Sequence, residues 1–197
     1  MEEIKVFDQL LEYPKKYNLE YWTNRSEKHF HVVPSGEILN REFVIIKKDD
    51  LFFCANDSYG SRTGNSRVYS GLYTTIDLPD TTEVSITKAD WTDRLFRVNK
   101  RKSENSYVNN HLTITSPSKD VPGGLISHAA VGYFLKITEM TYPINLVIEK
   151  DFNRLVRDLK GKVVIALEAR KWISEEQEIN HLLMYGDLLF NEIRNSI

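Results

Sequence analysis

The chain has 197 residues and a formal net charge of −2, so it carries no bulk positive charge to attract nucleic acid or an acidic membrane surface. Hydrophobic residues make up 41% of the chain and charged residues 27%, which is ordinary for a globular domain with a sizeable core. The length predicts one domain of generous size or two small ones tightly joined, and we treat residues 1–197 as a single domain. No run of about eighteen apolar residues occurs, so no transmembrane segment is expected.

Cysteine content and the N-terminus both bear on the compartment. Cys54 is the only cysteine, which rules out an intrachain disulfide and favours a reducing compartment. It lies in the apolar run LFFCA, which favours a buried side chain over a reactive thiolate. The N-terminal MEEIKVFDQLL is acidic and its apolar stretch is broken by charges, unlike a signal peptide. We therefore expect a cytoplasmic protein.

The first predicted element is a helix over residues 3–12, with Pro14 expected to end it. Residues 17–33 are ambiguous: YNLEYWTN fits either more helix or the start of a sheet, and HFHVV fits a strand. From Gly36 onward the pattern indicates strands. REFVIIKKDDLFFCAND has two apolar runs around KKDD, which is typical of a β-hairpin.

Further alternating segments follow, namely RVYSGLYTTIDL, TEVSIT, DRLFRVNK and NNHLTITS. Strands in succession with short turns predict an antiparallel sheet, either a meander or a partly closed barrel. SPSKDVPGG then interrupts the pattern and marks a possible subdomain boundary near 117–123.

The last third alternates helix and strand, which makes the predicted class α+β. A helix near 124–139 has a wide apolar face, and INLVIE and KVVIALEAR read as strands joined by a polar stretch that could be helical. A long C-terminal amphipathic helix follows, with Ser174 and Gln177 matching a capping box. Gly186 inside it indicates close packing or a local bend.

Motif searches point to no cofactor, metal or catalytic residue. The stretch GSRTGNS lacks the spacing, the lysine and the following helix of a P-loop, so a strand connection is favoured over anion contact through Arg62 or Arg67. His29 and His31 have a usable spacing for two metal ligands on a strand, but no H-E-x-x-H or C-x-x-C accompanies them. No G-x-S-x-G or carboxylate pair marks a catalytic site.

The first candidate ligand-binding feature is the basic run RLFRVNKRK. Nearby aromatic side chains could cooperate with it on RNA or on lipid headgroups, but acidic neighbours weaken its field, and an exposed turn at a strand end is the favoured explanation. Its basic residues are Arg94, Arg97, Lys100, Arg101 and Lys102.

The second candidate is an aromatic strand face. Tyr69 and Tyr73 share the face opposite the apolar stripe of their strand. If nothing covers that face, it is a platform for a peptide or ligand. We favour the alternative, in which the helix near 124–139 or the C-terminal helix covers it.

Three functions remain open, and we favour the first. It is a non-catalytic binding or scaffold domain that contacts another protein or a peptide through a sheet face or an edge strand. Second, a β-sheet closed by a long C-terminal amphipathic helix, with basic turns at one end, resembles pleckstrin-homology-like modules. That resemblance implies binding of a phospholipid headgroup or another anion. The third function is an enzyme whose site is assembled from scattered residues.

Overall fold

A single antiparallel sheet organises the molecule. The computed structural model describes residues 2–25, 38–60, 66–90, 100–101, 103, 105–117, 124–153 and 155–197. Within these ranges the sheet has nine strands in the order β1-β2-β3-β4-β9-β8-β5-β7-β6. Helices lie at the N-terminus, after the sixth and seventh strands and at the C-terminus, which confirms the predicted α+β class.

The element bounds are as follows. The strands are β1 (Glu20–Arg25), β2 (Ile38–Lys48), β3 (Leu51–Gly60), β4 (Ser66–Thr75), β5 (Val84–Lys88), β6 (Lys100–Arg101), β7 (Leu112–Thr115), β8 (Ile144–Lys150) and β9 (Val163–Ala169). The α-helices are α1 (Glu2–Lys16), α3 (Ser106–His111), α4 (His128–Met140) and α5 (Glu176–Arg194), and η1 (Arg157–Leu159) is a short 3-10 helix.

The predicted meander is present over β1 to β4, which are neighbours in both sequence and space. The KKDD hairpin is confirmed, because Lys48 pairs with Leu51 across a turn in which Asp49 has a positive φ. After β4 the order changes, since β9 and β8 are inserted between β4 and β5. Two C-terminal strands therefore form the centre of the sheet.

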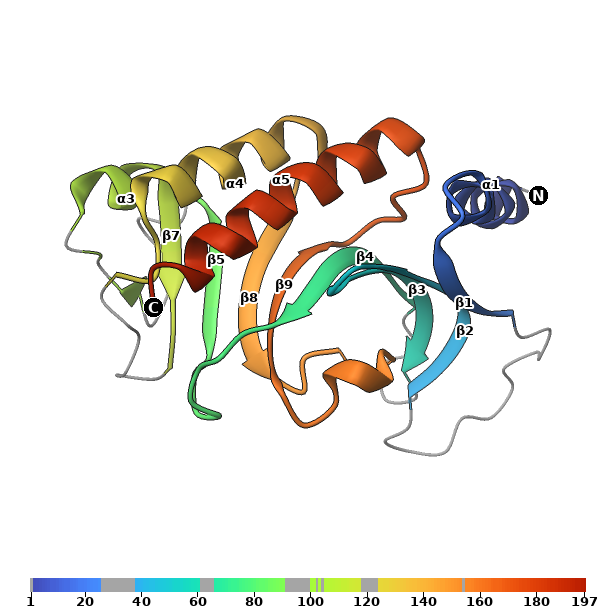
Figure 1. Ribbon diagram of the computed structural model, residues 1–197, viewed down its shortest axis with the longest axis horizontal. Helices are drawn as coiled ribbons and strands as arrows, with labels where there is room; N and C mark the ends of the chain where they lie inside the picture. Colours follow the sequence, from blue (N-terminus) through green and yellow to red (C-terminus); the bar gives the residue numbers. More distant parts are fainter. Residues whose placement is uncertain are drawn as a thin grey trace.

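Helices α4 and α5 lie side by side across one face of the sheet (Figure 1). The main hydrophobic core is between them and the sheet, and α1 contributes to it from the β1–β2 end. Gly186 allows the backbone of α5 to approach side chains of the sheet closely. A Cβ on it would lie 2.5 Å from Leu72 Cδ2 and 3.2 Å from Leu167 Cδ1, which confirms the close packing that its position indicated.

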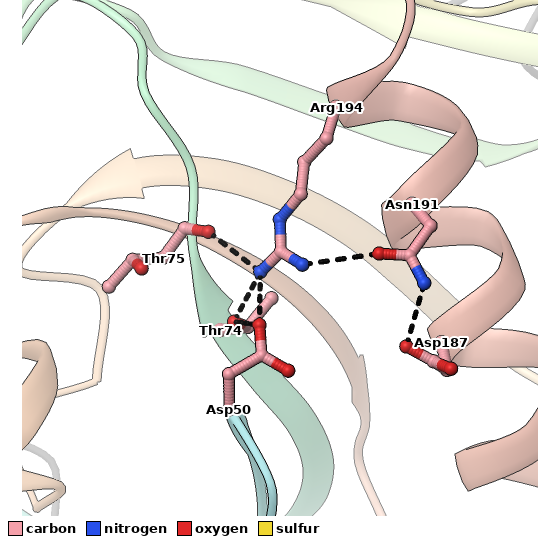
Figure 2. A network of polar contacts seen from close by, with 6 residues as sticks. All are labelled: Asp50, Thr74, Thr75, Asp187, Asn191 and Arg194. Carbon is pink, nitrogen blue, oxygen red and sulfur yellow. Dashed lines mark hydrogen bonds and ion pairs between the residues drawn. The ribbon is translucent and has the colours of Figure 1, made fainter.

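The last turn of α5 is tied to the sheet by a polar network around Arg194 (Figure 2). Its Nη2 donates to Asp50 Oδ2 at 2.7 Å, to Thr74 Oγ1 at 2.6 Å and to the Thr75 carbonyl at 3.1 Å. On the other side, Nη1 donates to Asn191 within the helix. The network thus joins α5 to the β2–β3 turn and to β4.

Some predicted element ends differ from the structure. Pro14 lies inside α1, because a proline in the last turn removes only one backbone hydrogen bond before the helix ends. The capping box of Ser174 and Gln177 is wrong, since the N-cap residue is Glu175 and its side chain makes no capping hydrogen bond. The strand expected over NNHLTITS begins only at Leu112, because the residues before it belong to helix α3. The Asn105 side chain caps the N-terminus of that helix.

The opposite face of the sheet is partly covered by the connection from β8 to β9, residues 151–162, which we call the β8–β9 loop (Figure 1). The two ends of the loop are joined by a hydrogen bond in which the Asp151 N–H donates to the Lys162 carbonyl at 3.1 Å. A second, smaller core forms beneath it from the loop and the sheet. Its members are Ile45, Phe52, Cys54, Tyr73, Val156, Leu159, Val164 and Ala166, with Phe43, Phe152 and Leu155 packed against them.

Candidate ligand-binding pocket

A pocket of about 320 Å³ lies between the edge of the sheet and the β8–β9 loop. Strands β1, β2 and β3 form one wall, and the residues before and within η1 form the other. Most of its surface is apolar, and two charged side chains complete it. The lining residues are Trp22, Phe43, Ile45, Phe52, Leu155, Val156, Arg157 and Asp158.

Strand register explains why these aromatic side chains meet. Trp22 is opposite Ile45 in the β1–β2 ladder, so both project from the same face of the sheet. Alternation along β2 places Phe43 and Lys47 on that face as well. Phe52 of β3 is the ladder partner of Lys47, so it projects from the same face. Trp22 remains 42% exposed, so the outer wall of the pocket is a large aromatic surface open to solvent.

The loop wall is held by hydrogen bonds between the Asn153 side chain and the loop backbone. Asn153 Oδ1 accepts hydrogen bonds from the N–H groups of Leu155 at 2.9 Å and Val156 at 3.4 Å. This Asx-type turn points the Leu155 and Val156 side chains at the sheet. The loop also bonds to the sheet through its charges, because Asp158 Oδ2 lies 3.6 Å from Lys47 Nζ.

A buried polar cluster lies further along the same face, towards the centre of the sheet. The Tyr73 hydroxyl donates to Glu168 Oε2 at 2.9 Å. Glu168 is the ladder partner of Gly71. A Cβ on Gly71 would lie 2.7 Å from the Tyr73 hydroxyl, so the tyrosine side chain occupies the space that a side chain at Gly71 would need. Burial raises the pKa of Glu168, and the Tyr73 hydrogen bond opposes that rise.

Cys54 belongs to this covered region. Its side chain is fully buried, as the sequence predicted, and burial raises the pKa of the thiol to about 12. The thiol is therefore protonated at neutral pH and a poor nucleophile.

The two predicted tyrosines lie on this face but not in the pocket lining. Tyr73 is fully buried, whereas Tyr69 is half-buried and its hydroxyl accepts a hydrogen bond from Asn56 Nδ2 at 2.7 Å. The face around Tyr73 is covered by the β8–β9 loop and not by α4 or α5, which pack on the opposite face. Ligand binding by Tyr69 and Tyr73 stays a prediction.

The basic candidates fall mostly outside the described residues. Arg94, Arg97 and Lys102 are not described, and neither are His29, His31 and residues 61–65 of the glycine-serine stretch. Lys100 and Arg101 form β6, where they pair with Thr115 and Ile114 of β7, and only their backbone is described. Ligand binding by these five basic residues stays a prediction.

Sequence reasoning missed the pocket itself. Trp22 lies in a segment whose structure the sequence leaves ambiguous, and the β8–β9 loop is predicted only as a polar stretch that could be helical. One signal was present, since Phe152, Leu155, Val156 and Leu159 recur at intervals of three, one and three residues and form an apolar side for the loop.

The described ranges contain no group of three or more His, Cys, Asp or Glu side chains that could hold a metal ion. None of the helices described is long and apolar enough to cross a membrane. In comparisons with known proteins, no family model matches the chain, and no curated protein matches it significantly.

Proposed function

We propose that this protein is a binding domain that holds an apolar group of its ligand or partner in the pocket between β1–β3 and the β8–β9 loop. The observation that carries the proposal is the pocket's composition. Six of its eight lining residues are apolar and three of those are aromatic. Its volume of about 320 Å³ is at the lower end of the range for pockets that take small ligands.

The exposed Trp22 supports this function on energetic grounds. A large aromatic surface left in water is costly, and covering it with an apolar group gains roughly 25 cal/mol for each Å² removed from water. Trp22 is 42% exposed although Phe43, Ile45 and Phe52 line the same pocket. An apolar group placed between Trp22 and Leu155 would be in contact with both walls.

The pocket is also held in shape before any ligand arrives. The β1–β2–β3 ladders fix one wall, and the Asn153 turn with the Lys47–Asp158 ion pair fixes the other. A preformed site loses less conformational entropy on binding than a site that must be assembled.

The test uses N-phenyl-1-naphthylamine, a neutral apolar dye whose fluorescence increases in apolar surroundings. We expect saturable binding to the wild-type protein. Leu155→Trp places a larger side chain in the pocket and should weaken binding at least about tenfold, because the apolar volume is then occupied. Leu135→Trp, at a half-buried position on α4 away from the pocket, is the matched control and should bind like wild type. Equal binding by the two variants would refute the proposal, provided that circular dichroism shows both to be folded.

A further inference from the structure

The two charged residues of the pocket, Arg157 and Asp158, differ in whether an opposite charge lies beside them. The carboxylate of Asp158 already has a cationic partner, since its Oδ2 lies 3.6 Å from Lys47 Nζ. Lys47 Nζ also lies 5.6 Å from the centroid of the Phe52 ring, so the ion pair is beside the apolar wall. Asp158 and Lys47 therefore largely compensate each other's charge at the pocket.

Among the described residues, Arg157 has no such compensation. It lines the pocket from the first position of η1, and within the described part of the chain it has no ion pair with a carboxylate. The acidic residue on the same face of β1, Glu20, is the ladder partner of Lys47 and does not line the pocket. As far as the described residues go, the lining thus combines an apolar cavity with one guanidinium group that has no carboxylate partner.

We propose that the ligand of this pocket is an organic anion, in which an apolar ring or branched chain carries one oxyanion group such as a carboxylate or sulfonate. This inference rests on the proposed function. The apolar body would lie among Trp22, Phe43 and Phe52, and the oxyanion would bind Arg157. A guanidinium group suits this role, because its planar array of donors matches two oxygens of one oxyanion. An apolar amine would instead be repelled by the same group.

The decisive experiment compares two dyes that share one apolar skeleton. N-phenyl-1-naphthylamine is neutral, and 8-anilinonaphthalene-1-sulfonate carries one additional sulfonate. For the wild-type protein at low salt we expect the sulfonate dye to bind about fivefold more tightly, as befits a partly exposed charge pair. Arg157→Gln should abolish this preference and leave the affinity for the neutral dye unchanged.

Lys160→Gln is the matched control. Lys160 is an exposed residue three positions further along the same loop and does not line the pocket, so its loss removes the same charge without removing the contact. The preference should persist in this variant. Equal affinity of the wild-type protein for both dyes, or equal effects of the two substitutions, would overturn the inference while leaving the apolar pocket intact. If Leu155→Trp weakens neither dye, the proposed function fails as well.

Two sources can supply this chemistry, a free organic acid or the C-terminal residue of a peptide. Competition against the bound sulfonate dye separates them, with 1-naphthylacetate in one arm and a short peptide ending in phenylalanine in the other. Displacement by naphthylacetate alone assigns a free acid. Displacement by the peptide with a free carboxylate, but not by its amide, assigns a chain end. Displacement by neither, or equally by the peptide and its amide, would contradict recognition of a carboxylate.

Discussion

The Tyr73 hydroxyl donates a 2.9 Å hydrogen bond to the carboxylate of Glu168, which lies 95 residues further along the chain. The bond joins β4 to β9, the strand inserted beside it, on the face covered by the β8–β9 loop. Tyr73 is fully buried, so its hydroxyl cannot exchange this partner freely for water.

Tyr73→Phe should therefore lower the free energy of unfolding by about 1.5–3 kcal/mol, the range for a hydrogen bond to a charged group. Urea denaturation at pH 7 measures the change. Tyr133→Phe is the matched control, because Tyr133 is half-buried on α4 and no hydrogen bond of its hydroxyl occurs within the described residues. Similar effects of the two substitutions would show that the Tyr73 bond contributes little.

Glu168 makes stability depend on pH in a defined direction. Burial raises its pKa above the ordinary 4.5, so the native state keeps a proton that the unfolded chain releases as the pH rises through that value. This contribution is fully present below the unfolded pKa and is lost as the pH increases through the native pKa. Relative to Glu168→Gln, the wild-type protein should therefore become less stable as the pH rises from 4 to 7.

Urea denaturation of both proteins across this pH range provides the measurement, since the difference between them isolates Glu168. Glu12→Gln controls for the loss of one carboxylate, because the Glu12 side chain is 75% exposed. A wild-type protein that gained stability over Glu168→Gln with rising pH would show that burial is outweighed by the Tyr73 hydrogen bond and the positive charge of Arg170, both of which lower the pKa of Glu168.

Gly186→Ala should destabilise the protein by about 1–3 kcal/mol, because the new methyl group would lie 2.5 Å from Leu72 Cδ2 in a packed interface. Gly132→Ala in α4 meets no atom within 4 Å and should instead stabilise by about 0.5–1 kcal/mol through helix propensity. In a Leu72→Val background the cost of Gly186→Ala should decrease. Thermal or urea unfolding is measured for the two glycine variants, for Leu72→Val and for the Leu72→Val/Gly186→Ala double variant. An unchanged cost of Gly186→Ala in the Leu72→Val background would place the strain elsewhere.

The network in Figure 2 predicts that Arg194 and Asp50 contribute unequally to the free energy of unfolding. Arg194→Ala should cost about 1–3 kcal/mol, because it removes donors to the buried Thr74 hydroxyl and the Thr75 carbonyl. Asp50→Asn should cost less than about 1 kcal/mol, because the Asp50 side chain is 60% exposed and solvent screens the pair. Chemical denaturation of both variants tests the order. A larger loss for Asp50→Asn would mean that the ion pair dominates.

Cys54 should react slowly with Ellman's reagent in the native protein. With a pKa of about 12, roughly one thiol in ten thousand is ionised at pH 8, and the side chain is fully buried. Because Cys54 is the only cysteine, the absorbance change reports this site alone. We expect the labelling rate to rise with urea concentration as the protein opens. Fast labelling without denaturant would show that the β8–β9 loop leaves the sheet readily.

Local patterns in the sequence determined most of the elements. Alternation over RVYSGLYTTIDL separates Leu72 and Ile76 of the main core from Tyr73 of the second core. Helical periodicity located α1, α4 and α5, and Gly186 marked a close contact. These features were predictable because each depends on side chains a few residues apart, which share one face of a helix or strand.

Tertiary structure alone decided the strand order and the pocket. Nothing in the sequence near β4 indicates that β9 will pair with it, because pairing between strands about ninety residues apart depends on the whole core. The pocket depends on the same long-range choice, since it joins Trp22 of β1 to Arg157 in the connection between β8 and β9. The sequence determined which surfaces are apolar, and the path of the chain decided which of them face each other.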